Sequence, residues 1–151
     1  MTDPRVSIVI LPGQRGFAPG DALSGEFTVH DLTADEIRAI EISVLWYTEG
    51  KGEEELGVHY FERIVPATVA GFDPQIARPF SAKLPNSPLS YDGVIVNIRW
   101  CVRVRLFLVR GREVLAERTF QLGSVPPAQA VPPSPLAMPL QPVMPDEAVM
   151  P

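Results

Sequence analysis

Three arginines near the middle of the chain have side chains that could recognise an anion. Arg99, Arg103 and Arg105 occupy alternate positions of an extended segment, with Cys101 between them. Alternate residues of a strand share one face and lie about 7 Å apart, and guanidinium groups bind carboxylates and phosphates in a bidentate manner. Two interpretations stay open: the arginines pair with glutamates of neighbouring strands, or they bind an acidic peptide or phosphate of a partner. The glutamates considered for such pairs are Glu41, Glu62 and Glu117.

Side chains suited to catalysis are scarce. The chain has one cysteine, Cys101, and two histidines, His30 and His59. Nucleophilic catalysis needs a base beside a serine or cysteine and an acid that orients the base. The sequence contains no HExxH, CxxC, GxSxG or P-loop pattern, and Cys101 falls inside an apolar strand pattern where a thiol usually serves packing. We therefore expect no enzyme, no cofactor and no metal site.

Aromatic side chains offer a second kind of binding surface. Trp46 and Trp100 each alternate with aliphatic residues, which predicts that both fill the core. Tyr47 has the opposite parity and is the better candidate for an exposed contact. With Tyr60 and Tyr91 it supports an alternative function, a β-sandwich that binds a small ligand or a carbohydrate through exposed aromatic rings.

Residues 94–109 (VIVNIRWCVRVRLFLV) form the element that must position these groups. Every second residue from Val94 to Leu108 is apolar, whereas the other set contains the three arginines. This alternation predicts a strand with one dry face and one mixed face. Sixteen residues at about 3.3 Å each would span roughly 50 Å, so the strand needs sheet along its whole length.

Similar alternation and Pro/Gly turns divide the rest of the first 123 residues. The predicted strands cover residues 5–11, 24–30, 40–47, 56–65, 80–84, 94–109 and 114–122. We expect a hairpin between 40–47 and 56–65, and a type II turn at Pro19-Gly20. Residues 31–36 are interpreted as a loop, although Thr33 and Glu36 have the spacing of a capping box for one helical turn. Seven or eight strands without an amphipathic helix predict a single antiparallel, immunoglobulin-like β-sandwich over residues 1–123.

The composition changes abruptly at residue 124. Nine of the last 28 residues are proline, and most of the others are apolar. Leu136, Pro139, Pro142 and Pro145 recur every three residues, which places them on one face of a polyproline II helix. We predict that residues 124–151 form a Pro-rich tail. It is a linker or disordered tail, a docking peptide for another protein, or a segment folded back on the sandwich.

Charge and cysteine content limit the partners and the compartment. The net charge is −5, which argues against nucleic-acid binding because phosphate affinity comes from a basic surface. The longest N-terminal apolar run is too short for a signal peptide or a transmembrane segment. A lone cysteine without a leader predicts a cytoplasmic protein.

Three segments, taken in order, resemble the N-terminal domain of the arrestin family. Residues 17–27 (FAPGDALSGEF) are similar to the Pro-Gly turn that leads into the family's second strand. Residues 37–47 (IRAIEISVLWY) are similar to a strand with the pattern Ile-x-x-Ile-polar-Ile. Residues 80–100 (FSAKLPNSPLSYDGVIVNIRW) are similar to the passage into the long central strand.

The resemblance implies a function as well as a fold. The family includes arrestins, arrestin-domain trafficking adaptors, the retromer arrestin-like subunit and bacterial sporulation-control proteins. It implies a sandwich that binds proteins or membrane-associated partners and catalyses nothing. Family members usually have two such domains, whereas this chain has room for one. We therefore expect a non-catalytic adaptor or scaffold that binds another protein, with self-association through an exposed edge strand as a further option.

Overall fold

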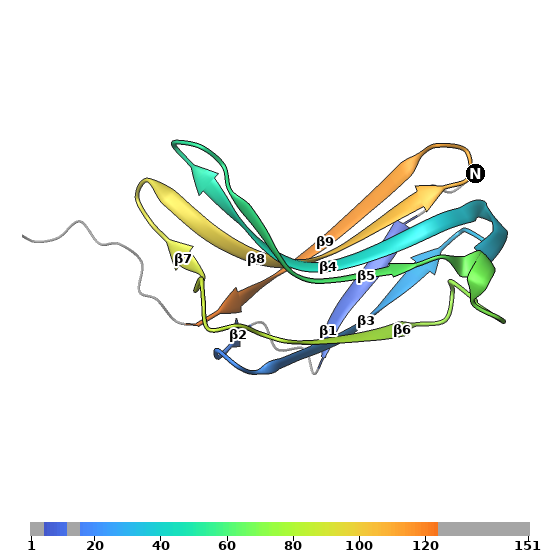
Figure 1. Ribbon diagram of the computed structural model, residues 1–151, viewed down its shortest axis with the longest axis horizontal. Coiled ribbons are helices and arrows are strands. Elements are labelled where there is room, and N and C mark those ends of the chain that lie inside the picture. Colours follow the sequence, from blue (N-terminus) through green and yellow to red (C-terminus); the bar gives the residue numbers. More distant parts are fainter. Residues whose placement is uncertain (1–4, 12–15, 124–151) are drawn as a thin grey trace, which may run out of the picture.

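The chain folds as two β-sheets packed face to face (Figure 1). The structure is a computed structural model, and it describes residues 5–11 and 16–123. Two 3₁₀ turns, η1 (Ala34–Glu36) and η2 (Pro66–Thr68), interrupt the strands. The strands are β1 (Arg5–Leu11), β2 (Gly16–Phe17), β3 (Ala22–His30), β4 (Ile37–Gly50), β5 (Leu56–Ile64), β6 (Arg78–Lys83), β7 (Tyr91–Asp92), β8 (Val96–Leu108) and β9 (Glu113–Leu122).

The two sheets differ in size. The smaller sheet has the order β1-β3-β6, and the larger has the order β2-β9-β8-β4-β5, with β7 added beside β8. The long strands all pair antiparallel, and only the two-residue strand β2 runs parallel to its neighbour β9. The predicted antiparallel sandwich and the hairpin of β4 with β5 are therefore confirmed.

The core lies between the sheets, and β8 contributes its dry face. The side chains of Trp100, Val102, Val104 and Leu106 are at most 1% exposed. They meet apolar residues of the smaller sheet such as Ile8, Phe27, Val29 and Phe80. The indole Nε1 of Trp100 donates a hydrogen bond to the carbonyl oxygen of Pro88 at 2.7 Å, which holds the segment before β7 against the core.

The predicted strand over residues 94–109 is wrong at its beginning. Val94 is 81% exposed and Ile95 is 66% exposed, because both lie in the turn that joins β7 to β8. The amide of Gly93 donates to the carbonyl oxygen of Val96 at 3.1 Å and closes this turn. The strand therefore begins at Val96, and alternation alone gave no sign of where the hairpin reverses.

Two other local predictions meet different outcomes. The Pro19-Gly20 turn is confirmed, since Asp21 donates to Ala18 and Gly20 has a φ of +86°. The loop interpretation of residues 31–36 is wrong, because η1 forms there and the Thr33 amide donates to the Glu36 carboxylate at 2.8 Å. The capping-box spacing was the correct signal.

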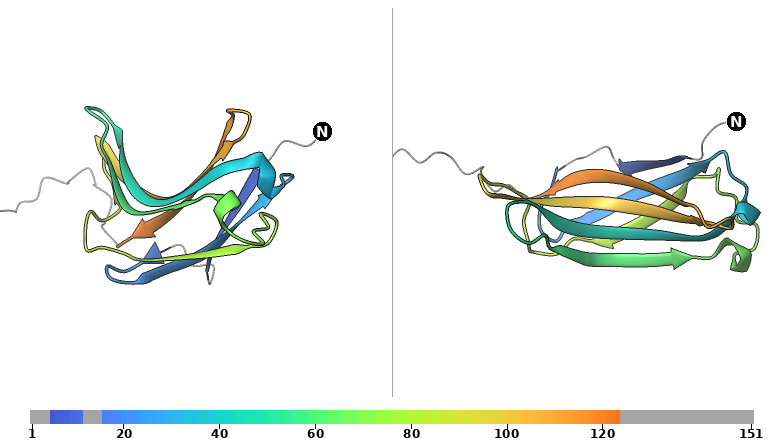
Figure 2. Two further views of the ribbon diagram at one scale, coloured as in Figure 1. Left: turned by 45° about the vertical axis from the view of Figure 1, so that its right-hand side comes forward. Right: turned by 90° about the horizontal axis from the view of Figure 1, so that it is seen from above.

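The larger sheet is strongly curved. In Figures 1 and 2 the strands β4, β5, β8 and β9 form a trough whose open side faces away from the smaller sheet. A β-bulge between Val44 and Leu45 in the β4–β5 pairing adds to this bending. We call the outward side of these four strands the concave face. It presents Glu41, Ser43, Leu45, Tyr47, Leu56, Val58, Phe61, Arg63, Arg99, Cys101, Arg103, Arg105, Glu113, Leu115, Glu117 and Thr119.

Candidate functional site

The three arginines point outward along β8, on the concave face. Arg103 lies opposite Glu117 in the β8–β9 register, and its Nε is 2.6 Å from the Glu117 carboxylate. Arg105 has a looser contact of 3.9 Å with Glu113. The structure thus shows the expected pairing with a neighbouring strand for Arg103, and recruitment of a partner by this stripe stays a prediction.

The other glutamates considered for the stripe have different partners. Glu41 accepts a hydrogen bond from Arg63 of β5 at 2.6 Å, directly across the β4–β5 ladder. Glu62 accepts from the hydroxyl of Tyr60 at 2.9 Å. Neither carboxylate therefore neutralises the β8 arginines by a direct contact.

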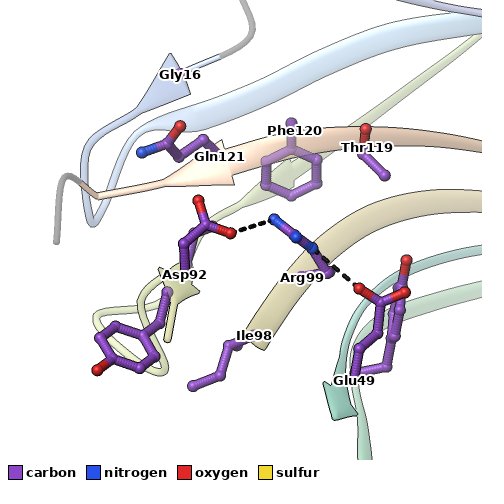
Figure 3. A pocket seen from close by; sticks show the side chains of 11 residues that line it. Gly16, Glu49, Asp92, Ile98, Arg99, Thr119, Phe120 and Gln121 are labelled. Carbon is purple, nitrogen blue, oxygen red and sulfur yellow. Dashed lines mark hydrogen bonds and ion pairs between the residues drawn. The ribbon is translucent and has the colours of Figure 1, made fainter. Parts of the chain in front are cut away.

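A pocket forms at one end of the concave face, where β8 changes its pairing partner. One edge of β8 pairs with β9 up to Trp100, and with the two-residue strand β7 at Ile98 and Asn97. Arg99 lies at the junction, and a hollow of about 400 Å³ opens there between β7 and β9. We call it the end pocket, and its lining includes Tyr47, Glu49, Tyr91, Asp92, Arg99 and Gln121 (Figure 3).

The wall of the end pocket is fixed by hydrogen bonds at the end of β9. The amide of Ser90 donates to the carbonyl of Leu122, and the amide of Leu122 donates to the hydroxyl of Ser90, both at 2.8 Å. These two bonds join the segment before β7 to β9 and so hold the two sides of the pocket at a fixed separation.

Arg99 crosses the end pocket between two carboxylates (Figure 3). Its Nε lies 3.1 Å from Glu49 of β4, and its Nη1 lies 2.7 Å from Asp92 of β7. The pKa of the Arg99 guanidinium is raised, and the hydrogen bond with Glu49 is the largest cause. Desolvation acts in the opposite direction and lowers this pKa in part. Arg99 is therefore paired on two sides, and its binding of an anion from a partner stays a prediction.

Tyr47 and Tyr91 meet at the end pocket, and Tyr60 does not. Tyr47 faces Arg99 directly across the β4–β8 ladder. Its pKa is raised first by burial and then by the negative charge of Glu49. Tyr60 lies on β5, packs against the core and uses its hydroxyl on Glu62. Tyr91 lies opposite Ile98 in the β7–β8 register, so its side chain has the opposite parity to Arg99. Of the three tyrosines suggested as a ligand platform, Tyr47 alone shares the concave face with Arg99.

The middle of the concave face is apolar. Leu45 and Cys101 face each other across β4 and β8, and both are almost fully buried although they point outward. Beside them, Leu56, Val58 and Phe61 of the edge strand β5 are each 53% exposed. A second, smaller hollow lies over this region, between these side chains and Arg103.

The described residues do not assemble a nucleophile, a base and an orienting acid in one place. Burial raises the pKa of the Cys101 thiol to about 12, with Glu117 as the next cause, so the thiol stays protonated at neutral pH. Ser7 and His30 lie 2.9 Å apart on the smaller sheet, but no carboxylate contacts His30 among the described residues. His59 bonds to the carbonyl of Lys83 at 2.6 Å.

Neither a metal-ligand cluster nor a membrane-spanning helix occurs within residues 5–11 and 16–123. That part of the chain holds no group of three His, Cys, Asp or Glu side chains placed to bind a metal ion. Nor does it contain a helix with the length and hydropathy needed to span a bilayer. The tail residues Leu136, Pro139, Pro142 and Pro145 lie outside the described residues, so their docking role stays a prediction.

Sequence reasoning missed the two carboxylates that define the end pocket. The predicted strand 40–47 ends before Glu49, but β4 continues to Gly50 and places Glu49 on the same face as Tyr47. Asp92 lies outside the predicted strands, before the one over residues 94–109. The parity of Glu49 with Tyr47 was an available signal, whereas the approach of Asp92 depends on how β7 joins the sheet.

Comparison of the structure with solved proteins identifies the fold. Spo0M, a sporulation control protein from Bacillus subtilis, matches with a TM-score of 0.58 and 15% sequence identity. The match covers 83% of this chain and 51% of Spo0M, so the chain spans about half the length of that protein. The fold is an arrestin-like β-sandwich of the Spo0M type.

Other comparisons add less to the arrestin-like assignment. Two structures of superoxide reductase (neelaredoxin) from Ignicoccus hospitalis match with TM-scores of 0.45 and 12% identity. The matched regions cover 80% and 81% of this chain, and 79% and 81% of the two reductase chains. No protein-family model and no curated protein matches the sequence.

Proposed function

We propose that this arrestin-like sandwich is a non-catalytic adaptor or scaffold that binds another protein through its concave face. The observation that supports this most directly is the apolar strip formed by Leu56, Val58 and Phe61, each about half exposed, on the wall of a trough. Exposed apolar side chains gathered on one concave surface are typical of protein interaction sites. The arrestin-like fold is consistent with such a role.

The charges on the concave face fit a protein ligand better than a free anion. Arg63, Arg103 and Arg105 each lie within 4 Å of a carboxylate of a neighbouring strand. Exposed ion pairs of this kind contribute little stability and can exchange partners at a polar interface rim. The face thus combines an apolar centre with a charged border, as specific protein interfaces do.

The proposal is tested with a peptide library displayed on phage and selected against the whole chain. Phe61→Glu places a charge in the apolar strip and is expected to weaken selected peptides by about ten-fold or more. Ile76→Glu is the matched control, because Ile76 is also a large exposed apolar side chain but lies before β6. Thermal unfolding of each variant establishes that both remain folded.

Two outcomes would contradict the proposal. If the selection yields no peptide with affinity above background, the proposed protein-binding function is wrong. Peptides that bind wild type and Phe61→Glu equally would place the binding surface elsewhere.

A second candidate function is the binding of a small polar ligand or carbohydrate in the end pocket. The observation that favours it is the presence of Tyr47 and Tyr91 in one hollow of about 400 Å³, a size within the range of ligand pockets. A glycan array with wild type and Tyr91→Ala tests it. A glycan bound by wild type and lost in the variant would support this function over the first.

Self-association through an edge strand and a cytoplasmic location stay predictions. The edge strand β5 carries the bulge opposite Val44 and Leu45, and His59 of this strand bonds to Lys83 of the other sheet. Both features hinder the addition of another strand along β5. The concave face is therefore a better supported surface for a partner than this edge.

A further inference from the structure

We propose that the end pocket binds the cationic side chain of an arginine or lysine supplied by the partner protein. This inference rests on the proposed protein-binding function and names the chemistry of the partner at one end of the concave face. It is carried by three observations on the described residues: a net negative charge in the pocket, an aromatic side chain in its wall, and acceptor oxygens that receive no hydrogen bond from them.

Among the described residues that line the end pocket, the acids outnumber the bases. Glu49 and Asp92 both bond to the guanidinium of Arg99, each through one oxygen. Within the same part of the chain, the second oxygen of each carboxylate has no hydrogen bond. The described lining therefore holds an excess of one negative charge, and each carboxylate retains an oxygen able to accept from a further donor.

The neutral polar groups of the pocket also favour a donor. Gln121 uses its amide nitrogen on the carbonyl of Gly123 at 3.2 Å, which leaves its carbonyl oxygen as an acceptor. Arginine and lysine side chains carry several N–H donors and no acceptor. A cationic side chain thus matches the hydrogen-bonding capacity that the pocket leaves unused.

Tyr47 provides the apolar part of the recognition. It lies directly across the β4–β8 ladder from Arg99, on the same face, and it lines the hollow. A guanidinium or ammonium group is attracted to the face of an aromatic ring, and the aliphatic stem of the same side chain packs against it. An aromatic ring beside carboxylates favours a cation over a neutral or anionic group of the same size.

The position of the carboxylates points to a side chain of a protein. The side chains of Glu49 and Asp92 are 52% and 64% exposed, so both lie at the rim and remain hydrated. A rim of this kind can receive the end of a side chain while its backbone lies along the concave face. Tyr47 belongs both to the pocket and to that face, so one polypeptide can contact the two regions together.

The chemistry is tested first with capped single residues and the whole chain. N-acetyl-arginine methylamide and N-acetyl-lysine methylamide are titrated at low ionic strength, and amide NMR shifts are recorded. We expect shifts to concentrate at Asp92, Arg99 and Thr119, and binding to weaken as salt is added. The neutral N-acetyl-citrulline methylamide, which keeps the shape of arginine, is expected to bind at least about five-fold more weakly.

Matched variants locate the site. Glu49→Gln and Asp92→Asn each remove one rim charge and are expected to weaken the arginine derivative by about five-fold. Glu113→Gln removes a carboxylate that contacts Arg105 on the same face, outside the pocket, and is expected to leave binding unchanged. Equal binding of arginine and citrulline derivatives, or full binding by both pocket variants, would overturn the inference.

The failures of the two proposals are distinguishable. If phage selection yields peptides that depend on Phe61 but carry no basic residue, the adaptor function stands and the pocket inference fails. If the arginine derivative binds as expected but no peptide is selected, the chemistry of the pocket is correct and its assignment to a protein partner is overturned.

Discussion

Cys101 shows how the environment of a single side chain decides its chemistry. It points outward from β8, yet it is fully covered, and burial raises the pKa of its thiol to about 12. The flanking arginines do not offset this, because Arg103 is paired with Glu117, whose charge also disfavours the thiolate. The residue therefore packs as a small apolar group.

The raised pKa of Cys101 predicts a specific loss of stability in alkaline solution. In the unfolded chain the thiol releases its proton near pH 9, whereas the folded chain retains it until about pH 12. The free energy of unfolding should therefore fall by about 1.4 kcal/mol per pH unit between these values. Urea unfolding of wild type and Cys101→Ala at several pH values isolates this slope, since the tyrosines contribute equally to both.

Reactivity gives an independent check on the same residue. Iodoacetamide should modify Cys101 slowly in the folded protein at pH 8 and rapidly in urea, because the thiolate is the reactive form. Rapid modification of the folded protein would contradict the burial of this thiol.

For single residues, the sequence predicted which face of a strand a side chain takes better than which side chains it contacts. Parity placed Trp100 inward and Tyr47 outward, because alternation along a strand decides which face a side chain takes. It did not predict that Arg99 would meet Glu49 and Asp92. Those contacts depend on which strands flank β8, and parity carries no information about strand order.

The hairpin of β4 and β5 shows how one element is adapted to its neighbour. Gly57 lies opposite Trp46 in the register, and the indole ring covers it. A Cβ at Gly57 would lie 2.2 Å from the Trp46 Nε1, so the ring could not keep its position. The glycine is required for close packing and not for an unusual backbone angle.

Substitution of Gly57 should therefore destabilise the hairpin. We expect Gly57→Ala to lower the free energy of unfolding by about 1–3 kcal/mol, as overpacking generally does. Gly16→Ala is the control, since a Cβ there meets no atom of the described residues within 4 Å, and its effect should stay within about 0.5 kcal/mol. Equal urea midpoints for wild type and Gly57→Ala would show that Trp46 does not occupy this position in solution.

The elements themselves were largely predictable, and their ends were not. Pro/Gly turns and alternation identified all seven long strands, because these signals are local. The end of β4 at Gly50 and the start of β8 at Val96 are set by pairing between the strands. Residues 48–50 carry no apolar alternation, so nothing in their types distinguished a paired strand end from a turn.

The molecule as a whole is acidic, and the arginines of its β8 stripe are paired with carboxylates. The net charge is −5, and each of the three β8 arginines has a carboxylate within 4 Å. Affinity for nucleic acids requires an uncompensated basic surface that releases counterions on binding. The arginine stripe seen in the sequence therefore does not form such a surface.

This charge distribution predicts no affinity for polyanions. The full chain should pass through a heparin column unretained at low salt, and duplex DNA should not alter its NMR spectrum. Retention that is reversed by salt would contradict the compensated arrangement. The variant Glu117→Gln, which frees Arg103, should increase any residual retention.

The fold class of the whole chain was accessible from the sequence, but its curvature was not. Strand number and parity were sufficient for a sandwich, and the ordered resemblance of three segments specified the arrestin-like type. The concave face arises from twist and from the bulge that β5 carries opposite Val44 and Leu45, which depends on how β4 and β5 pair. The curvature places the apolar strip of Leu56, Val58 and Phe61 on the wall of a concave surface, and the sequence did not predict that curvature.

The change of pairing partner along β8 has a consequence for how this scaffold can diversify. The hollow at Arg99 exists because two backbone ladders stop short of each other, and the side chains of Glu49, Asp92 and Gln121 border it without entering the core. Substitutions at these three positions, in evolution or in a laboratory library, should therefore change the free energy of unfolding little. New specificities would arise on an unchanged frame, much as antibody loops vary over a constant framework.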